Sequence, residues 1–181
     1  MSSQIKGSMN NRKKNMETGF IGECYAMYKL ALMGIVSANV GFMDYDILAA
    51  NEARVEVKTA KLRTVRDKRV NTTRDVWNFT NTSRSFHYES NRVYFRGAVK
   101  RDRKCDFFVL VCLDRKGKKV LKEFVVPKER IGSQMGMAIP KIFQLKGRSS
   151  FREYEDRWDL IKNFTSIANP TIKSNEGNND K

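Results

Sequence analysis

Apolar residues near the start of the chain recur at the spacing of a helix. On a wheel of about 100° per residue, five of them share one face: Phe20, Cys24, Met27, Tyr28 and Ala31. We therefore predict a helix over residues 19–33, with this face toward the core, Lys29 opposite and Glu23 on the core-side flank. Gly34 is expected to end the helix, because a glycine commonly occupies that position.

Three short apolar segments after this helix predict strands, over residues 35–40, 44–50 and 54–60. The last two are separated by Asn51 and Glu52, which suits a hairpin turn. The continuous apolar run Phe107–Leu113 predicts a central strand that is buried on both faces.

The end of the chain adds one more strand and further helices. A turn around Gly117 leads to a strand over 120–126, and Pro127 suits the first turn of a short helix. Residues 151–164 again have helical spacing. The order of elements predicts an α/β fold with a mixed β-sheet flanked by helices.

Charge is unevenly distributed along the chain. There are 35 Lys and Arg against 20 Asp and Glu in 181 residues, a net charge of +15. Residues 1–18 carry four basic and one acidic residue, residues 19–53 one and four, and residues 54–104 fifteen and five. We interpret 1–17 as a basic flexible arm, 18–164 as one folded domain, and the polar, Asn-rich residues 165–181 as a disordered tail.

This charge pattern favours a polyanionic partner, and nucleic acid is the commonest one. A solvated, lysine-rich surface without a partner is the alternative, which the clustering of arginine disfavours. The three cysteines share no CxxC spacing, which disfavours a disulfide framework and a Cys-based zinc site, and the single histidine, His87, excludes a His-rich metal site. The apolar stretch from Phe20 to Met43 is interrupted by charged residues, so no membrane contact is expected. We expect a cytoplasmic protein, encoded by a bacterium, an archaeon or a phage.

Candidate catalytic residues lie on the predicted hairpin. Glu56 and Lys58 are two residues apart in a strand, so they share one face while Val55 and Val57 point the other way. Asp46 can reach the same face from the preceding strand. Alone, such a pair is more often a solvent-facing strand pair, with Asp44 and Asp46 as turn residues. Together with Glu23 on the helix, the set is more specific, because two or three carboxylates and a lysine can hold Mg²⁺ and leave room for water and phosphate.

These residues resemble the motif of the PD-(D/E)xK nuclease superfamily, which has the restriction-endonuclease-like fold. The matching segments are TGFIGE (residues 18–23), YDIL (45–48) and VEVKT (55–59), with weaker matches at KCDFFV (104–109), VVPK (125–128) and YEDRWD (154–159). The usual proline before the aspartate is missing, since Tyr45 precedes Asp46. Within the superfamily, the chain is most similar to group I intron-encoded homing endonucleases and Holliday-junction resolvases.

The resemblance implies a role for each residue. Asp46 and Glu56 would be the principal Mg²⁺ ligands, with the Val57 carbonyl and Glu23 as further ligands and Asp44 as a substitute for Asp46; Mn²⁺ would replace Mg²⁺. Lys58 would position or deprotonate the attacking water. The implied reaction is hydrolysis of double-stranded DNA by in-line attack, leaving a 5′-phosphate and a 3′-hydroxyl. Cleavage of both strands with one site per chain implies a homodimer or homotetramer.

Residues 61–104 form a basic excursion that we expect to recognise DNA. Nine of its residues are candidate DNA contacts: Lys61, Arg63, Arg66, Lys68, Arg69, Arg74, Arg84, Arg92 and Arg96. Its interleaved aromatic residues, such as Trp77 and Phe79, are expected to be core rather than base-stacking residues. The length of the excursion favours a site-specific endonuclease of homing or restriction type. A junction resolvase and a DNA-binding protein without cleavage remain the alternatives.

Overall fold

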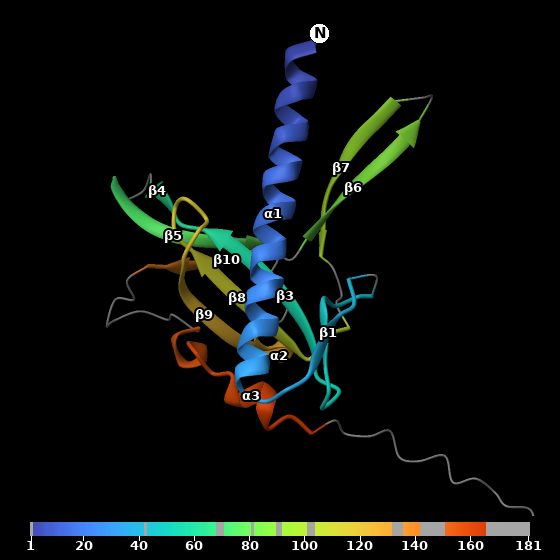
Figure 1. The fold of residues 1–181 in the computed structure, drawn as a ribbon. Helices are drawn as coiled ribbons and strands as arrows, with labels where there is room; N and C mark the ends of the chain where they lie inside the picture. The colour runs from blue at the N-terminus through green and yellow to red at the C-terminus, as the bar shows by residue number, and fades with distance from the viewer. Residues whose placement is uncertain are drawn as a thin grey trace, which may run out of the picture.

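A computed structural model describes residues 2–41, 43–67, 71–80, 82–89, 92–100, 104–131, 136–141 and 151–165. It has a mixed α/β architecture in which a long N-terminal helix packs on a five-stranded mixed sheet, with a three-stranded antiparallel sheet beside it (Figure 1). The predicted α/β fold with a mixed sheet is therefore confirmed. The predicted tail after residue 165 lies outside the described residues.

The five-stranded sheet has the order β1-β2-β3-β8-β9. Its strands are β1 (Ser37–Asn39), β2 (Ile47–Ala49), β3 (Arg54–Lys61), β8 (Phe107–Leu113) and β9 (Val120–Pro127). All neighbours are antiparallel except β3 and β8, which are parallel, with Glu56 opposite Phe108 and Lys58 opposite Leu110. These strands confirm the five predicted ones, although β1 and β2 are shorter. Pro127 is the last residue of β9, and α2 (Lys128–Ile131) follows it.

The described residues of the basic excursion form four strands after the end of β3. β4 (Arg63–Asp67) and β5 (Thr72–Thr80) form the three-stranded sheet with β10 (Gly136–Pro140), and β6 (Thr82–Glu89) pairs with β7 (Arg92–Lys100) as a separate hairpin. Trp77 fixes β5 against the larger sheet, because its indole N–H donates to the Leu113 carbonyl at 2.7 Å. Trp77 and Phe79 are buried, as expected for core residues.

Apolar residues cover both faces of the five-stranded sheet. On one face, Val55 and Val57 of β3 pack with Ala26 and Leu30 of α1. On the other face, Phe108 and Leu110 of β8 belong to a second cluster with Trp77, Phe124 and Met137. Strand alternation therefore directs the side chains of Glu56 and Lys58 toward the second cluster, away from α1.

Helix α1 (Ser2–Leu32) is longer than predicted, and the segment expected to be a flexible arm is helical from Ser2. The prediction that the α1 face with Phe20 and Tyr28 lies in the core is wrong. Phe20 is 65% and Tyr28 58% exposed, whereas Ala26 and Leu30 are fully buried. Lys29, expected on the solvent side, pairs with Glu123 of β9 at 2.9 Å.

The small residues of α1 explain this orientation. A Cβ atom on Gly22 would lie 1.8 Å from Oγ1 of Thr59 in β3, so the helix approaches the sheet more closely there than any larger residue permits. Gly34 ends the helix as predicted, with φ of 76°. The N–H of Ile35 donates to the Leu30 carbonyl at 3.0 Å, as in a Schellman motif. No helix among the described residues has a stretch both long and apolar enough to span a bilayer.

The predicted helix over residues 151–164 is wrong. The segment contains only a 3₁₀ turn, η1 (Arg152–Tyr154), and one α-helical turn, α3 (Asp159–Lys162). Asp156 interrupts them with φ of 55°, a conformation that a helix cannot include. The segment nevertheless supports the hairpin, because Nδ2 of Asn51 donates to the Ile161 carbonyl at 2.6 Å.

Substitution of Gly22 by alanine tests the close approach of α1. Alanine favours a helix by about 1 kcal/mol, but at this position it must displace Thr59, and overpacking costs about 1–3 kcal/mol. We expect Gly22→Ala to lower the free energy of unfolding, measured by urea denaturation. Gly19→Ala is the matched control, since nothing lies within 4 Å of a Cβ there. Greater stability of both variants would contradict the close packing.

Candidate active site

Asp46 lies where the pairing of β2 with β3 ends. Its N–H donates to the Val55 carbonyl at 3.0 Å, and its Oδ2 accepts a hydrogen bond from the Val57 N–H at 2.7 Å. Ile47 is opposite Val55, so the chain before Ile47 runs toward Val57. In a longer β2, a main-chain carbonyl would accept the hydrogen bond from the Val57 N–H. Here the Asp46 carboxylate accepts it instead, and this hydrogen bond fixes Asp46 against β3.

The same geometry orients the Val57 carbonyl. The N–H and C=O groups of one strand residue point to the same side of the strand. Because the Val57 N–H points to Asp46, the Val57 C=O also lies on the β2 side of β3. The structure therefore brings together the Asp46 carboxylate and the Val57 carbonyl, two of the predicted oxygen ligands.

Glu56 and Lys58 form an ion pair through Oε1 and Nζ. Glu56 is only 1% exposed, so the alternative of a solvent-facing strand pair is wrong. A carboxylate without a cation or hydrogen bonds is costly in such surroundings, and the ammonium group of Lys58 offsets this cost. The structure thus holds a charged Glu–Lys pair on the largely apolar face of the central strands.

Further charged groups surround the starts of β3 and β8. Asp106 accepts hydrogen bonds from the Arg54 backbone N–H at 2.8 Å and from its side chain at 3.0 and 2.7 Å. Burial alone would raise the pKa of Asp106, but these hydrogen bonds outweigh it and hold the pKa below its usual value. Burial, aided by the negative charge of Glu56, raises the pKa of Cys105 to about 12, so this thiol is protonated at neutral pH.

Glu23 and Asp44 have other partners. Helix α1 packs on the Val55 and Val57 face, so Glu23 and Glu56 belong to opposite faces of the sheet. Glu23 accepts a hydrogen bond from Nδ2 of Asn39 at 2.7 Å. Asp44 is exposed and lies 3.8 Å from Nζ of Lys104.

The described residues contain no group of three or more Asp, Glu, His or Cys side chains that could hold a metal ion. The three-carboxylate cluster of Asp46, Glu56 and Glu23 is therefore not formed in this structure. Of the predicted oxygen ligands, the Asp46 and Glu56 carboxylates and the Val57 carbonyl lie on β3 or beside it, and Glu23 does not.

Several predicted DNA contacts lie on the three-stranded sheet. The strand register pairs Arg63 with Val76, and Arg74 lies two residues before Val76 in β5. Arg63 and Arg74 therefore lie on one face of the β4–β5 pair, and both are exposed. Arg66 is on the other face, where its Nε donates to Asn71 at 3.2 Å. The side chains of Arg84, Arg92 and Arg96, and residues Lys68 and Arg69, lie outside the described part of the structure.

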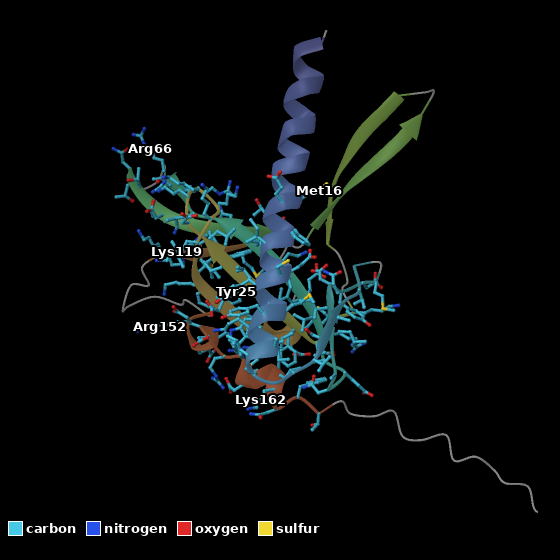
Figure 2. All side chains as sticks on the ribbon, in the orientation of Figure 1. Met16, Tyr25, Arg66, Lys119, Arg152 and Lys162 are labelled. Carbon is cyan, nitrogen blue, oxygen red and sulfur yellow. The ribbon has the colours of Figure 1, made fainter. Side chains whose placement is uncertain are left out.

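Sequence reasoning missed one basic element, the turn between β8 and β9. Arg115 holds this turn against the three-stranded sheet, since it donates to Thr64 at 2.8 Å and Asp75 at 2.7 Å. The turn exposes three lysines: Lys116, Lys118 and Lys119. Arg66 and Lys119 both lie at the β4–β5 end of the molecule (Figure 2). The density of basic residues from Arg115 to Lys119 was the available signal.

Comparison of the chain with family models, curated proteins and solved structures gave no match.

Replacement of Asp46 tests its contact with β3. Asp46→Ala leaves the Val57 N–H without this acceptor, which costs about 1–3 kcal/mol in the free energy of unfolding. Asp46→Asn keeps an acceptor oxygen and should cost less. Urea denaturation in EDTA measures both, with Asp44→Ala as the control, for which we expect a change below about 0.5 kcal/mol. Wild-type stability of Asp46→Ala would contradict the contact.

Proposed function

We propose that this protein is a Mg²⁺-dependent DNA endonuclease of the PD-(D/E)xK superfamily. The observation that carries the proposal is the arrangement on β3. A buried Glu56 is paired with Lys58, and Asp46 docks on the amide of the residue between them. The motif resemblance implies these three side chains and the Val57 carbonyl as the reactive set.

The donor chemistry fits Mg²⁺. This ion is usually bound by one or two carboxylates, keeps several waters, and does not need a cage of many protein ligands. Asp46 and Glu56 supply two carboxylates and Val57 a neutral carbonyl, all hard oxygen donors. When bound, Mg²⁺ supplies charge neutralisation at the phosphate and a lowered pKa for its water. Glu23 would act at most through a water, because it contacts Asn39.

The residues of the chain would perform the remaining steps. As an ammonium group, Lys58 would orient the attacking water and donate a hydrogen bond to the charge that develops on the phosphate. To take the proton of that water, Lys58 would first have to give its own proton to solvent. Asp46, fixed by the Val57 amide, would need no rearrangement before reaction. In-line attack would leave a 5′-phosphate and a 3′-hydroxyl.

Double-stranded DNA is the proposed substrate because the basic groups lie on exposed strands rather than in an enclosed site. Arg63 and Arg74 project from one face of the three-stranded sheet. The β8–β9 turn, which Arg115 holds to Thr64 on the other face, adds three exposed lysines there. Such groups contact phosphates and fix the register of a protein on a duplex. Site-specific cleavage of homing or restriction type remains the favoured form of this activity.

A plasmid-nicking assay tests the chemical step. We expect nicking by the wild type in Mg²⁺ or Mn²⁺ and none in EDTA. Asp46→Asn, Glu56→Gln and Lys58→Met should each lower the single-turnover rate by at least about 100-fold, while DNA binding in EDTA stays near wild type. Asp44→Asn is the control with expected full activity. Thermal melts verify that each variant is folded.

The alternatives give different results in the same assay. DNA binding without metal-dependent nicking by the wild type would support a non-catalytic DNA-binding protein and overturn the proposal. Preference for a four-way junction over linear duplex would identify a junction resolvase. Cleavage by Asp46→Asn with loss of activity in Asp44→Asn would transfer the ligand role to Asp44.

The salt dependence of duplex binding tests the proposed basic surface. With six to ten phosphate contacts, affinity should fall by roughly 10³–10⁵ between 50 and 200 mM salt. The double variant Arg63→Gln/Arg74→Gln should lower the slope of log K against log salt by about two. Arg157→Gln is the control, since Arg157 pairs with Asp159 on the C-terminal segment. A slope unchanged in the double variant would remove these arginines from the interface.

A further inference from the structure

Helix α1 is apolar on two opposite faces. One face, with Gly22, Ala26 and Leu30, packs on the five-stranded sheet. The opposite face carries a row at intervals of four residues, which we call the outer α1 row: Met16, Phe20, Cys24, Tyr28 and Leu32. All five residues of this row are exposed, and the four large ones are each more than half exposed.

Such a row normally has a partner. A helix that is apolar on all sides is usually buried, and a contiguous exposed apolar patch commonly marks an interaction surface. In Figure 1 α1 runs in front of the five-stranded sheet, and no labelled element crosses over the helix on the viewer's side. Within the described part of the chain, the fold thus buries one apolar face of α1 and leaves the other in solvent.

We propose that the outer α1 row binds the same row of a second copy of this chain, with the two helices antiparallel. The row is suited to a two-fold interface because it is nearly the same in both directions. Cys24 is its centre, Phe20 and Tyr28 flank it as two aromatic rings, and Met16 and Leu32 end it. An isologous interface requires this kind of self-complementary surface. The proposal does not depend on the nuclease activity.

The spacing of the row also indicates how the helices would cross. Residues four apart form the i±4 ridge of a helix, and two such ridges interdigitate at a crossing angle of about −50°. At this angle the closest contacts are at the middle of the row, around Phe20, Cys24 and Tyr28. We therefore expect these three residues to contribute most to binding.

Charge favours the antiparallel arrangement. Residues 1–18 carry four basic and one acidic residue, and residues 19–53 carry one basic and four acidic residues. Of these four acidic residues only Glu23 lies in α1, so the basic segments decide the orientation: antiparallel docking places them at opposite ends of the interface. A parallel pair would place like charges together, which costs free energy.

The available area suits a reversible dimer. Exposed aromatic side chains bury up to about 150–250 Å² each, and the row together offers on the order of 500 Å² per copy. The total of about 1,000 Å² is at the lower limit for specific protein–protein interfaces. We therefore expect dimerisation at micromolar concentration rather than an obligate dimer.

Sedimentation velocity over a concentration series tests the proposal. The wild type should pass from monomer to dimer, and Phe20→Glu or Tyr28→Glu should raise the dissociation constant by at least about 30-fold. These side chains are exposed, so the variants should fold, and circular dichroism verifies it. Leu121→Glu is the matched control, because Leu121 is an exposed apolar residue on β9, outside α1.

Cross-linking at Cys24 identifies the surface. A short bis-maleimide should link two wild-type chains and fail with Cys24→Ser, since Cys105 and Cys112 are buried. A wild type that stays monomeric at roughly 100 times a micromolar dissociation constant would overturn the proposal, because a micromolar dimer would be almost fully formed there. A dimer that survives both glutamate variants, or that is not linked through Cys24, would do so as well.

Discussion

The parallel pairing of β3 with β8 is the constraint on which the rest of this structure depends. Parallel neighbours cannot be joined by a tight turn, so the chain must cross from Lys61 at the end of β3 back to Phe107 at the start of β8. That crossing contains β4 to β7 and most of the basic excursion. A parallel pair is also stable only with both faces covered, and α1 and the three-stranded sheet cover them.

The Glu56–Lys58 pair is an exception within this apolar arrangement. Apolar residues of similar size at these two positions would often be as stable as the ion pair or more stable. The fold nevertheless keeps both charges in the centre of the sheet and adds the Asp46 carboxylate at the neighbouring strand edge. Residues that oppose stability in this way are expected at sites of chemistry, which agrees with the proposed function.

The sequence predicted the strands better than the helices. The run Phe107–Leu113 is buried at every position, so its hydrophobicity alone defines the strand. The Glu56–Lys58 face followed from strand alternation. The orientation of α1 could not be predicted from hydrophobicity, because its apolar residues occur on two faces and the packed face depends on the small side chain of Gly22. The break at Asp156 depends on a backbone conformation that the helical spacing of residues 151–164 conceals.

The hydrogen bond from Asn51 to the Ile161 carbonyl has a consequence for the order of assembly during translation. Asn51 is in the turn that joins β2 to β3, and it is made early, whereas Ile161 is synthesised more than a hundred residues later. The turn between β2 and β3 therefore gains this anchor only when the C-terminal segment has left the ribosome. A nascent chain would carry its basic strands before this turn is anchored.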